Sequence, residues 1–171
     1  MIGQDSEKEM SQKQKTSHLM AVIRLRGTIN VHFKVSETMD MLNVRKTNYM
    51  TVIPSTSSYM GMLKKSKDFL TWGEINQETL EHIIQKRGEI EGKKRITDKF
   101  VKENTPYPTI KALSKALLNG EISLSDVPNM KKFFRLHPAR KGYKALKKGF
   151  AEGGDLGYRG AAINELIVRM A

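Results

Sequence analysis

The sequence predicts an α/β or α+β fold in which several helices pack on one small β-sheet, followed by a basic C-terminal extension. Between residues 21 and 88, short segments typical of strands are separated by segments in which apolar residues recur every three or four positions, as in helices. Beyond residue 88 this pattern loosens, and Lys and Arg become frequent. Strands and helices that alternate in this way favour helices layered on a sheet.

Composition and charge limit the possible functions. The 171 residues include 30 Lys and Arg against 18 Asp and Glu, which gives a formal net charge of +12. A compact body with that field attracts polyanions, most often nucleic acid and next an anionic membrane surface. No apolar run approaches the roughly 20 residues that cross a bilayer, so we expect no membrane association. The sequence contains no cysteine, which excludes disulfides and cysteine nucleophiles and fits a cytoplasmic protein.

Residues 1–20 are expected to form a disordered N-terminal extension. They are polar and aperiodic, and their acidic and basic side chains balance. Such a stretch buries too little apolar surface to offset the entropy of ordering it. Because Met20 and Ala21 open the patterned region directly, Met20 is an alternative to Met1 as the natural start.

Residues 21–26 are expected to form the first strand. Ile23 and Leu25 alternate with Arg24 and Arg26, so this strand is predicted to have one apolar and one basic face. The alternative is that the two arginines merely solvate one face of the sheet. The candidate RNA contacts of this strand and the loop after it are Arg24, Arg26, Thr28 and Asn30.

Capping and breaking residues predict the rest of an α/β core domain at residues 21–88. Ser36 can cap a helix, because its side-chain oxygen accepts hydrogen bonds from free amide groups of the first turn. Pro54 ends a strand because it has no amide hydrogen to donate. The predicted elements are a helix over 37–46, a strand over 49–53, a helix over 57–65, a strand over 69–72 and a helix over 77–87.

Residues 89–171 are expected to form an extension with a basic RNA-binding loop and a terminal helix. Helical spacing and capping residues predict short helices from Thr97 to Lys102 and from Thr109 to Leu118. An amphipathic helix is predicted from Ala161 to Met170. A basic cluster precedes the first of these helices, and its cations are candidate phosphate contacts. The cluster is formed by Lys93, Lys94 and Arg95.

The segment from Lys131 to Phe150 carries the strongest functional signal. It holds eight Lys and Arg residues and no Asp or Glu in 20 positions, with aromatic residues interleaved. Cations neutralise phosphates, and aromatic or guanidinium planes stack on exposed bases. The alternative is a solvated basic face, but the density and single sign of the charges favour contact with RNA or DNA. The candidate contacts are Arg135, His137, Arg140, Lys141, Tyr143, Lys144, Lys147 and Lys148.

A glycine-rich stretch precedes the last predicted helix. Residues 152–160 contain four glycines, and glycines let a backbone approach a phosphate at a helix N-terminus. The sequence has neither the P-loop nor the dinucleotide-binding pattern, so a glycine-rich turn without a ligand is at least as good an interpretation. Arg159, inside this stretch, is the last candidate RNA contact.

We expect no catalytic residue, no metal site, no cofactor and no small-molecule substrate. The four histidines are scattered and show neither the H-x-x-x-H nor the H-E-x-x-H spacing of metal ligands. Catalysis needs positioned acid–base groups or a metal cage. We find no cluster of Asp, Glu or His in the sequence that would supply either.

Several short motifs, taken in order, carry a resemblance that covers residues 21–171. They are Ile23–Gly27, Phe69–Gly73, Gln85–Gly88, Lys93–Asp98, Leu136–Gly142, Glu152–Gly157 and Leu166–Met170. Together they resemble the archaeal and eukaryotic branch of the universal large-subunit ribosomal protein family, called thirty in bacteria and seven in eukaryotes. The eukaryotic relatives carry a long basic N-terminal arm that residues 1–20 do not resemble, which favours an archaeal source.

The resemblance implies an α+β fold with a three-stranded sheet in the order β-α-β-α-β, related to the ferredoxin-like fold. It also implies a non-catalytic ribosomal constituent that binds large-subunit ribosomal RNA beside neighbouring ribosomal proteins and supports assembly and translation. The family's basic loop usually reads Pro-Pro-Arg-Gly-Gly, whereas Ala139 and Lys141 replace the second proline and a glycine here. The second hypothesis is an RNA-binding or RNA-processing factor that uses the same fold away from the ribosome.

Overall fold

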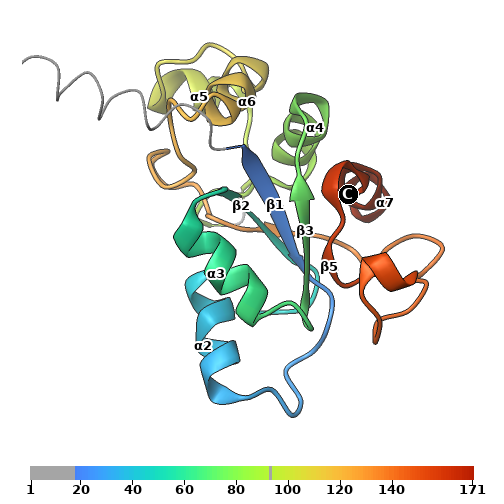
Figure 1. Cartoon of the computed structure of the whole chain (residues 1–171). Coiled ribbons are helices and arrows are strands. Elements are labelled where there is room, and N and C mark those ends of the chain that lie inside the picture. The colour runs from blue at the N-terminus through green and yellow to red at the C-terminus, as the bar shows by residue number, and fades with distance from the viewer. Residues whose placement is uncertain (1–17, 93) are drawn as a thin grey trace, which may run out of the picture.

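The computed structural model describes residues 18–92 and 94–171. Its elements alternate between strands and helices in the first half and become short in the second half (Figure 1). The two η elements are short 3₁₀ turns. In chain order the elements are β1 (Leu19–Arg24), α2 (Phe33–Met41), β2 (Tyr49–Pro54), α3 (Ser57–Lys65), β3 (Leu70–Glu74), α4 (Gln77–Arg87), α5 (Asp98–Asn104), α6 (Ile110–Leu118), β4 (Phe134–Arg135), η1 (Phe150–Glu152), β5 (Gly157–Tyr158), η2 (Gly160–Ala162) and α7 (Ile163–Met170).

The strands form one five-stranded sheet in the order β4-β2-β1-β3-β5. β1 lies in the centre, antiparallel to both neighbours, so that Met20 pairs with Ile53 on one side and with Glu74 on the other. β4 adds to the edge at β2 in antiparallel fashion, and β5 adds to the edge at β3 in parallel fashion. The predicted α+β class is confirmed, but the prediction of three strands is wrong, because the second half of the chain adds a two-residue strand to each edge.

Helices cover both faces of the sheet. On one face, Val22 and Trp72 belong to a buried cluster to which α2 and α3 contribute Met39 and Leu63. On the other face, Ile23 belongs to a larger cluster, to which α4, α6 and α7 each contribute a buried leucine. Burying one such apolar side chain stabilises the fold by roughly 1.5–3 kcal/mol. The three leucines that α4, α6 and α7 place in this cluster are Leu80, Leu113 and Leu166.

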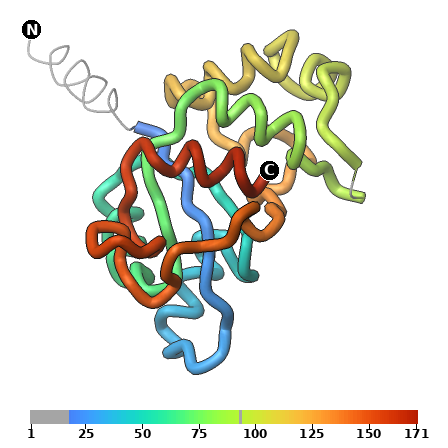
Figure 2. Tube along the Cα trace, turned by 90° about the vertical axis from the view of Figure 1, so that its right-hand side faces the viewer, coloured from blue at the N-terminus to red at the C-terminus, as the bar shows by residue number. Residues whose placement is uncertain are grey.

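The second half of the chain completes the core of the first half. α6 and α7 both contact α4, and Figure 2 shows α7 in red beside α4 in green. Phe134 of β4 is fully buried in the same cluster as Ile23 of β1. Residues on both sides of the predicted boundary at residue 88 therefore share one buried cluster.

Local capping explains where most helices begin and why one differs from its prediction. α3 and α4 have the predicted bounds, and Asn76 Oδ1 accepts a hydrogen bond from the Thr79 amide at 3.0 Å to cap α4. α2 starts earlier than predicted, at Phe33, because His32 Nδ1 accepts a hydrogen bond from the Lys34 amide, so that Ser36 is not the cap.

The N-terminal boundary also differs from its prediction. β1 begins at Leu19, and Met20 is buried in the core with 3% of its surface exposed. These two residues therefore belong to the sheet, although the sequence predicted disorder up to residue 20. The rest of that prediction concerns residues 1–17, which lie outside the described residues, together with the exposed residue His18.

Candidate nucleic-acid interface

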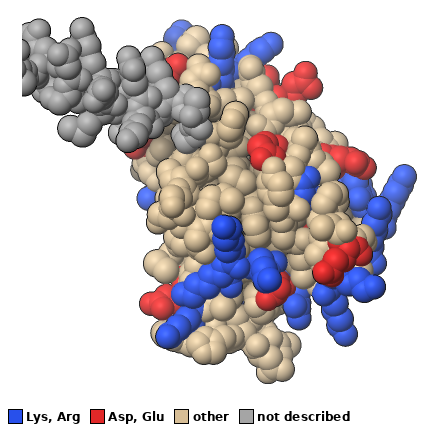
Figure 3. Space-filling view, viewed as in Figure 1, with Lys and Arg blue, Asp and Glu red and all other residues tan. Residues whose placement is uncertain are grey.

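The predicted basic segment forms a loop on the surface, and we call residues 135–148 the basic loop. It connects β4 to the turn that contains η1 and has little regular secondary structure. Figure 3 shows Lys and Arg side chains gathered along the right-hand edge, where Figure 1 places this loop. Its exposed polar side chains are Arg135, His137, Arg140, Lys141, Lys144, Lys147 and Lys148.

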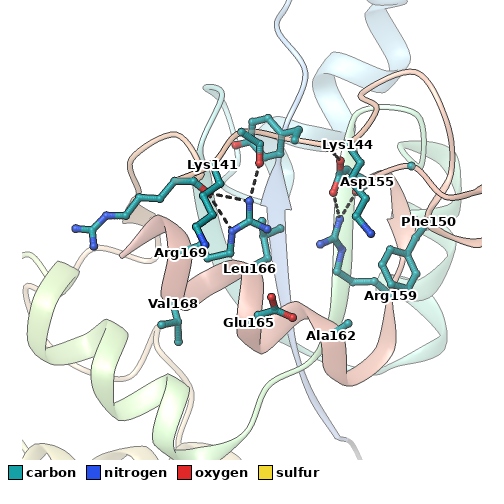
Figure 4. Close-up of a pocket in the computed structure, with 14 residues that line it drawn as sticks. Lys141, Lys144, Phe150, Asp155, Arg159, Ala162, Glu165, Leu166, Val168 and Arg169 are labelled. Atoms are coloured by element: carbon teal, nitrogen blue, oxygen red, sulfur yellow. Dashed lines mark hydrogen bonds and ion pairs between the residues drawn. The ribbon is translucent and has the colours of Figure 1, made fainter.

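A buried carboxylate ties the middle of the basic loop to the sheet. Asp155 Oδ2 accepts hydrogen bonds from the backbone amides of Lys144 and Ala145 at 2.6 and 3.1 Å. Its Oδ1 pairs with the Arg159 guanidinium at 3.0 Å. Figure 4 shows Arg159 beside Asp155. Arg159 Nε in turn donates to Thr71 Oγ1 of β3 at 2.9 Å. Asp155 and Arg159 therefore position the loop through its backbone.

A second anchor comes from the end of α7. The Arg169 guanidinium donates to the carbonyl oxygens of Arg140 at 2.8 Å and of Gly142 at 2.7 Å (Figure 4). The backbone amide of His137 donates to the carbonyl of Met170 at 2.9 Å. These bonds engage backbone groups of the loop and leave its own cationic side chains free to meet a ligand.

The cations of the basic loop lack acidic partners within the part of the chain that the structure describes. None of its Lys or Arg side chains forms an ion pair there within 4.0 Å, whereas Asp155 is already used by Arg159. Uncompensated positive charge on a fixed backbone raises the local concentration of anions. The loop is therefore a surface that attracts anions.

The backbone of Lys141 adopts a conformation that favours glycine, the residue of the family pattern at this position. Its φ of 67° lies in the left-handed region, as does the φ of 71° at Gly142. This conformation closes a turn in which the Gly142 amide donates to the Ala139 carbonyl at 2.9 Å. The left-handed region costs a residue with a Cβ roughly 1–2 kcal/mol, which glycine avoids.

A second group of cations surrounds Glu89 beside the loop. Lys131 Nζ bonds Glu89 Oε2 at 2.7 Å, and this hydrogen bond holds the pKa of Glu89 below its ordinary value. The charges of Lys131, Arg135 and Arg95 act in the same direction, against the opposing effect of partial burial. The structure thus brings together Arg95 and Arg135, which are 40 positions apart in the sequence.

Arg87 joins this group, although the sequence did not indicate it as a candidate. Its pKa is lowered by partial burial and by the nearby charges of Arg95 and Arg140. Arg87 shares the helical spacing of the apolar stripe of α4, so its pattern in the sequence indicated packing. The signal that could have revealed it is a cation placed in an otherwise apolar stripe.

The prediction of a basic face on the first strand is wrong. Arg24 is 1% exposed, and its guanidinium donates to the carbonyls of Arg26, Gly27 and Arg45 at 2.9, 3.1 and 2.7 Å. Both faces of β1 are covered by helices, so a side chain opposite the apolar face is buried as well. Arg24 therefore holds the β1–α2 loop and is not displayed to a ligand.

The other candidates around that loop lie apart from the basic loop. Arg26 stacks on Phe69, with 5.1 Å between its guanidinium carbon and the ring centroid, and remains partly exposed. Thr28 and Asn30 are exposed in the loop between β1 and α2, at the bottom of Figure 1. The structure therefore does not join these candidates with the basic loop in one continuous group.

The remaining candidates fall into three situations. Arg159 is 8% exposed and acts on Asp155 and Thr71, so its placement differs from the expected surface position. Tyr143 is partly buried, which raises its pKa, and its hydroxyl donates to Asn48 Oδ1 at 3.2 Å. Lys94 is exposed in the turn after α4, and Lys93 lies outside the described residues.

Comparison with known proteins identifies the family. The model of the family described as Ribosomal protein L30p/L7e matches residues 20–70. The large ribosomal subunit proteins uL30 of Methanosphaera stadtmanae and Archaeoglobus fulgidus are each 47% identical over 152 residues, which is 89% of this chain and 99% of each relative. The corresponding protein of Methanobrevibacter smithii is 45% identical over the same shares. The chain belongs to the L30p/L7e family.

The L30p/L7e relatives are similar over far more of the chain than the family model covers. Their alignments extend over 152 residues, so the similarity is not confined to the segment from β1 to the start of β3 that the family model matches. Within residues 18–92 and 94–171, no helix is long and apolar enough to cross a membrane. The same residues contain no group of three or more His, Asp or Glu arranged to hold a metal ion.

Proposed function

We propose that this L30p/L7e protein is a structural constituent of the large ribosomal subunit, where it binds large-subunit ribosomal RNA and supports assembly and translation. The observation that carries the proposal is the basic loop, whose backbone is tied to β3 and α7 while its cations have no acidic partner among the described residues. The relatives are named as large-subunit proteins. The proposed RNA contacts are Arg26, Thr28, Asn30, Lys93, Lys94, Arg95, Arg135, His137, Arg140, Lys141, Lys144, Lys147 and Lys148.

The anchored backbone supports this proposal energetically. Ordering a loop on binding costs free energy, and interactions that fix the loop beforehand reduce that cost. Arg24, Tyr143 and Arg159 are assigned to positioning and not to direct contact, because their polar groups are engaged inside the protein. Exposed cations then supply the affinity by replacing the counterions of the RNA.

Salt dependence tests the RNA contact. If about five of the loop cations meet phosphates, log K should fall against log salt with a slope near −4, from roughly −0.7 to −0.9 per phosphate. The double variant Lys147→Gln, Lys148→Gln should flatten this slope by about 1.5 and leave the melting temperature unchanged, because exposed charges contribute little to folding. The matched control is Lys111→Gln, Lys115→Gln on α6, which should keep the parental slope. Affinity that does not respond to salt would contradict the proposal.

Sedimentation distinguishes a ribosomal constituent from an off-ribosome RNA-binding or RNA-processing factor. On a sucrose gradient of a cell lysate, a constituent remains with the large subunit at high salt, whereas a transient factor is washed off. We expect the protein in the ribosome under both conditions. We propose no catalytic role, cofactor or small-molecule substrate, since the family is one of ribosomal structural proteins.

A neighbouring ribosomal protein is proposed to cover the outward face of α2. Phe33 and Met41 on this face are 74% and 60% exposed, and Ile29 in the preceding loop is 88% exposed. Glu37 and Asp40 are exposed on the same helix, and their carboxylates would repel RNA. Apolar side chains beside carboxylates instead suit a protein segment that offers both apolar groups and cations.

A further inference from the structure

We infer that the groove between the basic loop and α7 receives an unpaired nucleotide of RNA, with its base stacked on Phe150. This inference rests on the proposed function and specifies what kind of RNA structure the site takes.

The groove has a volume of about 720 Å³. That volume falls within the range of roughly 300–1,000 Å³ that is usual for sites of small ligands. Figure 4 shows Lys141 and Arg169 toward one end and Lys144 and Phe150 toward the other, with α7 along one side. A flat duplex backbone would not fill such a hollow, whereas a single extruded nucleotide would.

Phe150 is a fixed aromatic surface. The Arg159 guanidinium lies over its ring at 4.9 Å from the centroid. Arg159 is itself buried and held by Asp155 and Thr71, so the cation cannot turn away from the ring. The side chain of Phe150 nevertheless remains exposed, with 40% of its surface open. A base can therefore stack on a ring whose position is set before binding.

Cations around the groove match the phosphate of the same nucleotide. Arg140, Lys141 and Lys144 line it, and their side chains have no acidic partner among the described residues. Asp155 also lines the groove, but its carboxylate is engaged by Arg159 and by two backbone amides. Glu165 of α7 is the remaining carboxylate of the lining, and it can accept a hydrogen bond from the amino group of a base.

The bases of a duplex are already stacked on their neighbours and cannot stack on Phe150. Only an unpaired base offers its face to an aromatic side chain, which is how proteins commonly distinguish loops and bulges from paired RNA. An acidic peptide would also satisfy the cations of the groove. Its carboxylates would gain nothing from the aromatic ring. Dependence of binding on Phe150 therefore distinguishes an unpaired nucleotide from an acidic peptide.

The test uses two RNA hairpins that are identical except for one bulged adenosine, with affinity measured by fluorescence anisotropy at fixed salt. We expect the parent protein to bind the bulged hairpin about 5- to 150-fold more tightly, the range that stacking of one base provides. Phe150→Ala and Phe150→Leu should both remove this preference and keep the parental salt slope. Phe150→Trp should retain the preference, and the fluorescence of the new indole should be quenched by the bulged hairpin and not by the fully paired one. The signal reports on position 150, because Trp72, the only tryptophan of the parent sequence, is buried with 5% of its surface exposed.

The possible outcomes separate the inference from the proposed function. Equal affinity of the folded parent for both hairpins, with the expected salt slope, would overturn the inference and leave the proposed function intact. A preference that survives in Phe150→Leu would also overturn it. A glutamate-rich decapeptide that binds more tightly than the bulged hairpin, in the parent and in Phe150→Ala alike, would overturn the inference in favour of a peptide site. Failure to bind either hairpin at any salt concentration would count against the proposed function itself.

Discussion

Lys141 combines a strained backbone with a useful charge. Its φ of 67° favours glycine, so Lys141→Gly should raise the free energy of unfolding relative to Lys141→Ala by about 1 kcal/mol. Both variants lose the same cation and should bind RNA equally weakly, with a salt slope flattened by about 0.7–0.9. Urea denaturation and anisotropy titration measure the two effects. If the two variants were equally stable, a side chain at position 141 would not strain the backbone of the turn.

Arg24 and Arg26 were predicted on the same face of the first strand, but the structure buries Arg24 and leaves Arg26 partly exposed. Arg24→Ala should lower the free energy of unfolding by about 3 kcal/mol, because it removes a buried guanidinium that bonds several carbonyl oxygens and leaves them without donors. Arg26→Ala should change stability by less than about 1 kcal/mol, since its stacking on Phe69 is partly exposed. Thermal unfolding followed by circular dichroism compares them. A larger loss at Arg26 would reverse this assignment.

Glu89 gives the protein a pH-dependent contribution to stability. Its folded-state pKa is lowered, first by the hydrogen bond from Lys131, so the pair stabilises the fold above the ordinary carboxyl value of about 4.5. That stability is lost as pH falls through the lowered pKa. Glu89→Gln should therefore cost about 1 kcal/mol at pH 7 and less at pH 2. Urea melts of the two proteins at both pH values test this, and a constant difference would exclude the pair as its cause.

The misplaced candidates show what local pattern cannot reveal. Arg24 lies opposite two apolar neighbours, which is typical of a solvent-facing position when only one face of a sheet is covered. Helices α2 and α3 cover the second face, and the pattern of the strand alone does not report that they pack there. Arg159 is buried through Thr71, a partner 88 positions away. The basic loop was found correctly as a surface feature because its charge density is itself a local property.

Among the secondary-structure elements, the loop anchor formed by Asp155 can be tested directly. Asp155→Ala removes two acceptor contacts to the loop backbone and leaves the buried guanidinium of Arg159 unpaired. We expect the melting temperature to fall and trypsin to cut faster at Lys144, Lys147 and Lys148. Glu152→Ala, an exposed change in the adjoining turn, is the control. Unchanged cleavage in Asp155→Ala would mean that other contacts hold the loop.

Helices capped by Asn or Thr could be predicted from the sequence, whereas the edge strands and the start of α2, which His32 caps, could not. α4 begins after Asn76 and ends at Gly88, and both signals are local. β4 and β5 contain two residues each, too few to show an alternating pattern. They are strands only because β2 and β3 offer free edges to them. Local sequence therefore determines the helices, while the final width of the sheet depends on long-range pairing.

For the whole molecule, two faces are expected to meet two different kinds of partner. The chain contains no cysteine, so a single introduced thiol can be labelled uniquely with a photo-crosslinker. In assembled large subunits, Met41→Cys on α2 should crosslink to a protein, and Lys144→Cys in the basic loop should crosslink to RNA. Nuclease and protease treatment of the products identifies each partner. RNA attached at position 41 would contradict the protein-facing assignment of α2.

The two short edge strands also affect the order in which the sheet can form during synthesis. β1, β2 and β3 have all been synthesised by residue 74, but β5 is not complete until residue 158. At about 5–20 residues per second, the ribosome needs roughly 4–17 s to make the 84 residues between them. During this time the outer edge of β3 has no strand to pair with, and the outer edge of β2 has none until β4 is made at residue 135. Free edges recruit other chains. The nascent protein is therefore most vulnerable to mispairing before its own C-terminal half emerges, when a chaperone would protect it most.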